Sequence, residues 1–185
     1  YFVDCADATC TGASTRTILD GGTNCYLTGC STTESSGAGS FLDCSQGSTD
    51  CKISYMRNYN RYFADCNDET CTDPGGNSST TTLLDGAASC SLTNCSSGAS
   101  GLAATAGGLD CHLSATDCKL AYQEGDAVQN LHFGDCGSAT CSSGTRETVD
   151  GDITLRDFGH YLNVECPTPD NCKLAYHNNT DGSLR

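Results

Sequence analysis

The sequence predicts an all-β fold of three tandem repeats, each with about four antiparallel strands stapled by local disulfides. Three observations lead to this prediction. The hexapeptide DCKISY at residues 50–55 recurs as DCKLAY at residues 117–122 and as NCKLAY at residues 171–176. Sixteen cysteines stand in short pairs along the 185 residues, and no stretch shows sustained helical periodicity. A β-solenoid-like array is the alternative arrangement of these strands.

Alignment on the first cysteine of each copy defines the repeats. YFVDCADATC, YFADCNDETC and LHFGDCGSATC open the three copies, and TILDG, TLLDG and ETVDG follow them. Each copy then ends in the hexapeptide. We therefore divide the chain into repeat 1 at residues 1–60, repeat 2 at residues 61–130 and repeat 3 at residues 131–185. Self-similarity at such a period is typical of solenoids, propellers and arrays.

The strands are expected from alternation and composition. In repeat 2, Leu120 and Tyr122 alternate with Lys119 and Ala121, which is the pattern of a strand with two different faces. β-branched and aromatic residues recur in these stretches, and Gly, Ser, Asn, Asp and Thr fill the intervals between them. The four strands expected in repeat 1 run at residues 40–44, at residues 51–57, into Cys5, and from Cys10 to Asp20.

The cysteine spacing predicts hairpin staples. Four, five or six residues separate the members of each neighbouring pair, and eight such pairs use all sixteen cysteines. A disulfide across the mouth of a short hairpin fits the required Cα separation and fixes a register that small polar side chains specify weakly. If every pair is local, packing and strand pairing must join the repeats. The expected pairs are Cys5–Cys10, Cys25–Cys30, Cys44–Cys51, Cys66–Cys71, Cys90–Cys95, Cys111–Cys118, Cys136–Cys141 and Cys166–Cys172.

The last and first residues together read as the start of a further repeat. SLR at residues 183–185 followed by YFVDC at residues 1–5 gives SLRYFVDC, in phase with RYFADC of repeat 2. Either the last strands pair with the first strand to close a ring, or the chain is one period of a longer array. Both interpretations leave open strand edges that must be covered. The residues expected at this joint are Tyr1, Phe2, Val3, Asp4, Cys172, Lys173, Leu174, Ala175, Tyr176, Leu184 and Arg185.

These short motifs resemble the tandem β-repeats of bacterial extracellular propeller-type surface proteins. The motifs are a strand ending in C-x-D-x-T-C, a Thr-rich strand ending in DG, and a KLAY strand. The resemblance covers all three repeats and implies four-stranded propeller-like blades, the last completed by SLRYFVDC. Because propellers have about four to eight blades, three blades favour two units closing one ring or a longer stacked chain. The sialidase-like glycosidases of this fold carry S-x-D-x-G-x-T-W boxes, which this Trp-free chain lacks, so no catalytic residue is transferred.

Composition limits the compartment and the partners. The net charge of −14 argues against nucleic acid, since phosphate binding needs clustered Lys and Arg. Abundant paired cysteines in a chain poor in large apolar residues indicate an oxidising compartment, and we expect an extracellular or cell-surface protein. There is no run of about 18 apolar residues for a membrane span.

Aspartates recur once per repeat before cysteine and before glycine. An acid/base role is one interpretation, but an active site is usually built once, whereas a turn is needed in every copy. We therefore predict that these carboxylates cap turns by accepting from nearby backbone N–H groups, and we assign no catalytic residue. The aspartates are Asp4, Asp65 and Asp135 before cysteine, and Asp20, Asp85 and Asp150 before glycine.

Two further candidate sites are specific to single places. Repeat 3 lacks the middle cysteine pair and has DGDITLRD instead, where Asp150 and Asp152 are candidate calcium ligands. Asn77 and Asn178 lie in sequons and are candidate glycosylation sites. No other cofactor is expected.

The function predicted from the sequence is structural. We expect a subunit or repeat unit of an extracellular filament or surface fibre that self-assembles by end-to-end strand complementation, with itself as partner and without enzymatic activity. The alternative is a propeller-type adhesin or lectin that binds glycans. A glycosidase is the most distant alternative.

Overall fold

A computed structural model describes residues 2–5, 15–23, 25–33, 36–47, 49–72, 79–96, 107–123, 130–150, 158–178 and 182–185. The described residues form β-strands, turns and loops without any helix, so the predicted all-β class is confirmed for them. The same residues accordingly contain no helix that could cross a membrane.

The strands form antiparallel sheets whose order follows the chain. A two-stranded sheet consists of β1 (Phe2–Asp4) and β2 (Thr15–Thr17). The first four-stranded sheet consists of β3 (Ser36–Asp43), β4 (Lys52–Arg57), β5 (Asn60–Asp65) and β6 (Thr80–Asp85). The second consists of β7 (Gly107–Asp110), β8 (Lys119–Gln123), β9 (Leu131–Cys136) and β10 (Gly144–Asp150). The last sheet consists of β11 (Phe158–Thr168), β12 (Asn171–Asn178) and the short β13 (Ser183–Leu184).

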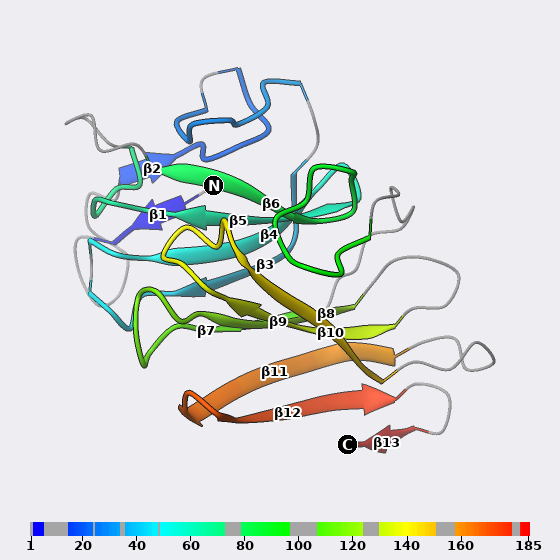
Figure 1. Ribbon diagram of the computed structural model, residues 1–185. Helices are drawn as coiled ribbons and strands as arrows, with labels where there is room; N and C mark the ends of the chain where they lie inside the picture. The colour runs from blue at the N-terminus through cyan, green and yellow to red at the C-terminus, as the bar shows by residue number, and fades with distance from the viewer. Residues whose placement is uncertain are drawn as a thin grey trace.

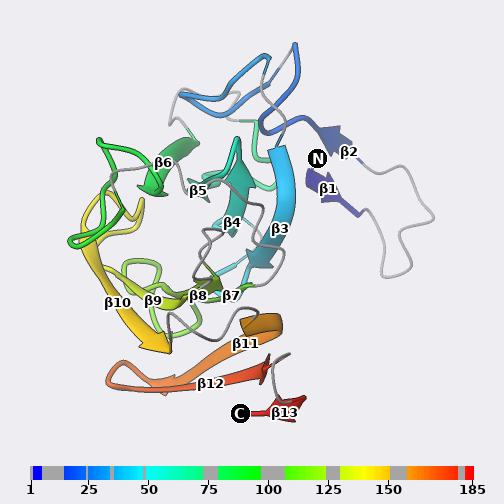
Figure 2. The same ribbon diagram turned by 90° about the vertical axis from the view of Figure 1, so that its right-hand side faces the viewer.

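The sheets lie in successive layers. Sheet β3–β6, sheet β7–β10 and sheet β11–β13 follow one another in Figure 1, and the view in Figure 2 shows the same order. β1 lies toward one end of this stack and β13 at the other, so the two strands are far apart in both views. The described strands close into neither a barrel nor a propeller.

Each four-stranded sheet spans a boundary between predicted repeats. β3 and β4 belong to the end of repeat 1, while β5 and β6 belong to the start of repeat 2, and β7–β10 combine repeats 2 and 3 in the same way. The link between β4 and β5 is a tight turn at Asn58 and Tyr59, which have φ of 48° and 65°. Positive φ at both central residues is the signature of a two-residue hairpin turn.

Two apolar clusters lie on the two faces of sheet β3–β6, and equivalent positions of the sequence build both. In each cluster, the leucine before the DG aspartate and the leucine eight residues later pack on the second and fourth residues after the hexapeptide cysteine. The pairs of equivalent buried residues are Leu19 and Leu84, Leu27 and Leu92, Ile53 and Leu120, and Tyr55 and Tyr122. A third cluster, around Val164 and Ala121, joins sheet β7–β10 to sheet β11–β13.

Short-range disulfides staple the hairpins and loops. The structure contains Cys25–Cys30, Cys44–Cys51, Cys66–Cys71, Cys90–Cys95, Cys111–Cys118, Cys136–Cys141 and Cys166–Cys172, with Cα separations of 4.0 to 6.3 Å. These coincide with seven of the eight pairs expected from spacing. Cys10, the partner expected for Cys5, lies outside the described residues. None of the seven joins one predicted repeat to another.

Candidate assembly interface

The sheets are built from two kinds of hairpin. The first kind ends a predicted repeat and the second kind begins one, and the hairpins of a kind share their register over three consecutive residue pairs. Diagnostic pairs of the first kind are Asp43↔Lys52, Asp110↔Lys119 and Glu165↔Lys173. Diagnostic pairs of the second kind are Asp65↔Thr80, Asp135↔Thr145 and Asp4↔Thr15.

The two ends of the molecule therefore carry one hairpin of each kind, each without the partner hairpin that completes the interior sheets. Each four-stranded sheet contains one hairpin of each kind, paired through β4 and β5 or through β8 and β9. Hairpin β1–β2 is of the second kind and pairs with no other described sheet. Hairpin β11–β12 is of the first kind, and only the two-residue β13 lies beside it.

β4 and β8 each pair with a hairpin of the second kind, whereas β12 does not, and their burial differs accordingly. Every residue of β4 and of β8 is buried. In β12, by contrast, Lys173 and Ala175 are exposed and Leu174 is half-buried, although Tyr176 beside β13 is buried. The surface that the other two sheets bury thus remains accessible on β12 at Lys173 and Ala175, before the part that pairs with β13.

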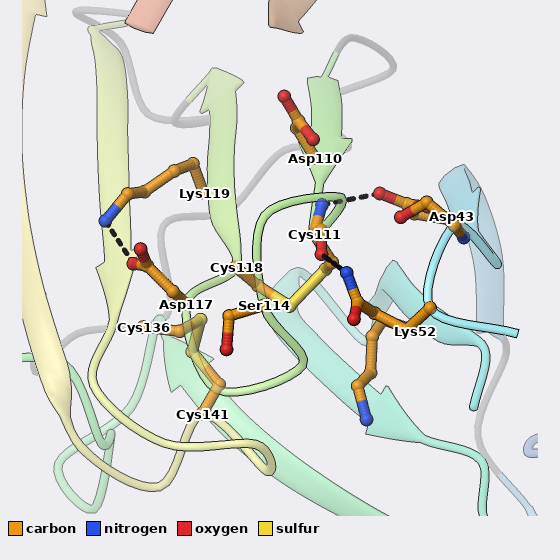
Figure 3. Close-up of a disulfide and its surroundings, with 12 residues drawn as sticks. Asp43, Lys52, Asp110, Cys111, Ser114, Asp117, Cys118, Lys119, Cys136 and Cys141 are labelled. Carbon is orange, nitrogen blue, oxygen red and sulfur yellow. Dashed lines mark hydrogen bonds and ion pairs between the residues drawn. A yellow bond between two sulfur atoms is a disulfide. The ribbon is translucent and has the colours of Figure 1, made fainter. Parts of the chain in front are cut away.

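Hydrogen bonds between layers also repeat in a fixed direction. The carboxylate of Asp43 accepts from the backbone N–H of Cys111 in the next layer (Figure 3). Asp110 accepts in the same way from Cys166, at 2.6 Å. The next acceptor in this series is Glu165, which is exposed on the outer layer, and the first donor position is Cys44, which is exposed at the other end.

Two of the exposed large apolar side chains lie on strands of the complete sheets, one on β3 and one on β10. Leu42 is 56% exposed in the first layer, whereas Val164, at the equivalent position of the last layer, is buried against Gly108. At the position before the DG aspartate, exposure instead increases toward the C-terminal sheets. Val149 is 48% exposed, although its equivalents Leu19 and Leu84 are buried in the two apolar clusters. Leu42 and Val149 are therefore exposed on the two complete sheets, each of which adjoins a half-sheet at one end of the stack.

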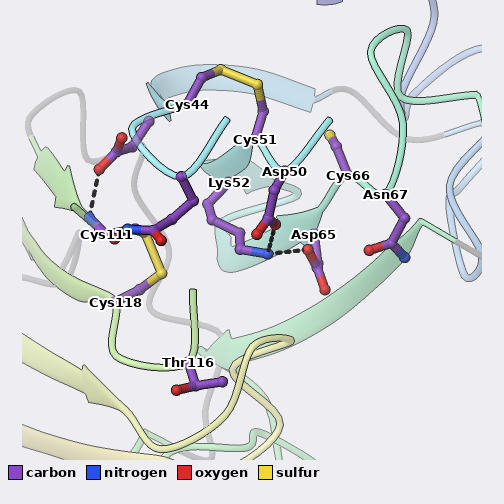
Figure 4. A network of polar contacts seen from close by, with 12 residues as sticks. Cys44, Asp50, Cys51, Lys52, Asp65, Cys66, Asn67, Cys111, Thr116 and Cys118 are labelled. Carbon is purple, nitrogen blue, oxygen red and sulfur yellow. Dashed lines mark hydrogen bonds and ion pairs between the residues drawn. A yellow bond between two sulfur atoms is a disulfide. The ribbon is translucent and has the colours of Figure 1, made fainter. Parts of the chain in front are cut away.

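A buried lysine joins the two hairpins of each complete sheet. Lys52 forms ion pairs with Asp50 of its own hairpin and with Asp65 of the next (Figure 4). Lys119 repeats this arrangement, with its Nζ 2.5 Å from Asp117 and 2.6 Å from Asp135. Both lysines are almost fully buried.

The turn-cap prediction is therefore wrong for Asp65 and Asp135. Both stand directly opposite a lysine in the strand register, so their carboxylates share a face with an ammonium group rather than a turn. A signal was present in the sequence, because the lysine and the aspartate each adjoin a stapled cysteine in every copy.

The turn-cap prediction is confirmed for Asp20 and Asp85. Oδ1 of Asp85 accepts from the N–H groups of Gly86 at 2.9 Å and Ser96 at 2.6 Å. Asp20 accepts likewise from Gly21 at 2.8 Å.

The second oxygen of these carboxylates has partners that sequence reasoning missed. Oδ2 of Asp85 accepts from the Tyr122 hydroxyl at 2.8 Å and from Arg146 at 2.6 Å. Burial, and then the charge of Asp85, hold the pKa of Tyr122 well above its usual value. The pairs Tyr55–Asp20 and Tyr176–Asp150 repeat this contact, which the tyrosine ending each hexapeptide could have indicated.

The remaining predicted sites are placed only in part. The carboxylate of Asp150 accepts from Tyr176 and Arg185, and Asp152 lies outside the described residues. Among the described residues no cluster of three His, Cys, Asp or Glu side chains could hold a metal ion. Asn178 pairs with Ser183 in the backbone register, but its side chain, like the whole of Asn77 and Tyr1, lies outside the described part.

The ion pair between Asp110 and His112 gives a pH-dependent prediction. The ring Nδ1 lies 2.5 Å from the carboxylate, and this hydrogen bond raises the pKa of His112 above its usual value. We expect a contribution to stability that is complete below the unfolded value of about 6.5 and is lost as pH rises through the higher folded pKa. NMR titration of the ring should give this raised pKa, and Asp110→Asn should return it toward the usual range. A wild-type His112 that titrates at or below the usual value would contradict the assignment.

Comparisons with protein-family models, with curated proteins and with solved structures find no match for the chain. The functional argument therefore rests on the arrangement of strands and contacts described above.

Proposed function

We propose that the chain is a structural subunit, or repeat unit, of an extracellular filament or surface fibre assembled end to end by strand complementation. The observation that carries the proposal is the pair of complementary half-sheets at the two ends. β12 of one unit would receive the β1–β2 hairpin of the next unit as β4 receives β5–β6, so that main-chain pairing extends across the joint. The joint is the same whether that hairpin belongs to a second copy or to a further repeat of a longer chain.

The exposed edge of β12 supplies a physical reason for assembly. An open strand edge is a template for pairing, and natural proteins usually cover or blunt it. Here Lys173 and Ala175 are exposed at strand positions that β4 and β8 bury completely, and Leu42 and Val149 lie exposed on the two complete sheets, next to the half-sheets at the ends. A neighbouring unit would cover all of them in one step.

An open array agrees better with the layers than a ring within one chain. β1 and β13 lie apart and are not paired with each other. The complete sheets are four-stranded meanders, as propeller blades are, and we infer that they are tandem blades that follow one another in a stack. In such an array each unit contacts only its neighbours, so the array can grow without limit.

The disulfides agree with an extracellular location. Seven of them are described, and such a density is typical of proteins that fold in an oxidising compartment. The described residues give no observation that favours the adhesin or glycosidase alternatives.

Negative-stain electron microscopy of the unreduced chain tests the proposal. We expect uniform filaments with a regular axial repeat, because each joint recreates an interior sheet. Deleting residues 1–4 should abolish the filaments and leave the individual units folded, as near-ultraviolet circular dichroism would show. A matched control is Tyr26→Ser, which removes an exposed aromatic side chain from a loop that contains none of the predicted joint residues. Filaments that persist after the deletion, or a folded wild-type chain that never assembles, would overturn the proposal.

A further inference from the structure

The lysine of the hexapeptide has an equivalent at the joint. Lys52 faces Asp65 and Lys119 faces Asp135 across the two hairpins of each complete sheet. Lys173 is the third lysine of the series, and it is exposed. The third aspartate of the second kind of hairpin is Asp4, which pairs with Thr15 as Asp65 pairs with Thr80.

The short strand β13 lies one residue out of phase with the interior sheets. Tyr176 and Arg185 are joined by two backbone hydrogen bonds of 3.0 and 2.9 Å. Inside the stack the equivalent of Arg185 is Arg61, and it faces Met56, the residue after the tyrosine. The interior phase would instead place Arg185 opposite His177.

This single residue decides which side chain meets Lys173. Continued through SLRYFVD, the phase of β13 would put Val3 opposite Lys173 and turn Asp4 to the other face. The interior phase puts Asp4 opposite Lys173. A slip of one residue moves every side chain of a strand to the opposite face, so the two phases cannot be mixed.

We propose that Lys173 forms an ion pair with Asp4 of the next unit, and that this pair sets the register of the joint. When the joint forms, β13 would shift by one residue along β12. The inference rests on the proposed strand complementation and names the contact that makes it specific. In the alternative phase, closure of the joint would cover Lys173 with Val3 and leave both charges without their partners. Burying charges in that way is strongly unfavourable.

The neighbouring charges make Asp4 the decisive partner. Asp50 and Asp117 give each interior lysine a second carboxylate, but the equivalent residue beside Lys173 is Asn171. Glu165 lies opposite Lys173 on β11. Its equivalents Asp43 and Asp110 turn toward the backbone of the next layer instead of toward their lysines. The joint would therefore hold one ammonium group and one carboxylate.

Charge reversal in the whole chain tests the pair. We expect Lys173→Glu alone and Asp4→Lys alone to raise the critical concentration for assembly about a hundredfold, because each brings like charges together. The chain with both changes should assemble again. An equal mixture of the two single variants should also assemble, in alternation, because every joint then brings together either the two native side chains or the two reversed ones. Sedimentation and electron microscopy provide the readout.

A second variant distinguishes the two registers. Asp4→Ala combined with Val3→Asp moves the carboxylate by one residue, and we expect the assembly of this variant to be as weak as that of Asp4→Ala alone. If this variant assembled like wild type, the joint would have the same phase as β13, and the inference would be overturned. Single reversals that assemble like wild type would also overturn it, while leaving strand complementation intact. A wild-type chain that does not assemble would instead count against the proposed function. Circular dichroism should show all variants folded, since Lys173 is exposed in the isolated unit.

Discussion

Full reduction of the disulfides is expected to unfold the chain at room temperature. The seven described bonds close loops with sequence separations of 5 to 7. The chain-entropy relation gives about 2 kcal/mol for each loop, or on the order of 15 kcal/mol together. This sum equals or exceeds the net free energy of unfolding of a typical domain, about 5 to 15 kcal/mol. Loss of the cooperative thermal unfolding transition, followed by far-ultraviolet circular dichroism after reduction, is the measurement.

The order of reduction provides an internal control. Cys44 is exposed, so its bond to Cys51 should react with a phosphine reductant first. Cys66, Cys71 and Cys141 are fully buried, and their bonds should need mild guanidinium before they react. Timed alkylation and peptide mass spectrometry would give this order. A fully reduced chain that keeps its far-ultraviolet spectrum and thermal midpoint would show that packing alone maintains the fold.

The staples and most strands could be predicted because their determinants are local. A cysteine pair such as Cys66 and Cys71 has few geometrically acceptable partners other than its neighbour, so spacing alone indicates the bond. Alternation in KLAY similarly indicates a strand, and β8 covers these residues. Which strands share a sheet was harder to predict from the sequence, because no local pattern shows that the chain turns at Asn58 and Tyr59 and continues in the same sheet.

The polar clusters could not be predicted because their partners are distant and not equivalent. Asp20, Asp85 and Asp150 each accept from a tyrosine at the same sequence position, but the arginines come from different positions. Arg57 lies on β4 of its own repeat, whereas Arg146 lies on β10, 61 residues from Asp85. Aligning the repeats identifies only residues that recur at equivalent positions, so it could not identify the arginine partners of these aspartates.

Asp85→Ala is expected to be among the most destabilising single substitutions in the chain. The carboxylate is buried and accepts four hydrogen bonds, from Gly86, Ser96, Tyr122 and Arg146. Its removal takes this carboxylate away from a mostly buried guanidinium and from the Ser96 N–H and Tyr122 hydroxyl, while the Gly86 N–H keeps the Ser96 carbonyl at 3.2 Å. Breaking one partner of a buried ion pair costs about 3 to 5 kcal/mol, and the orphaned donors add to this. The midpoint of guanidinium unfolding, with an unchanged slope, measures the loss.

The matched control is Asp150→Ala, at the same sequence position in repeat 3. The side chain of Asp150 is 25% exposed and that of its arginine, Arg185, is 43% exposed, so water can replace the lost contacts. We expect a loss of about 1 kcal/mol or less, as for exposed ion pairs. If the two substitutions were equally mild, Asp85 would not be the buried charge that links two layers. If they were equally severe in the isolated chain, the outer layer would already be as well covered as the interior one, which would remove the physical reason for the joint.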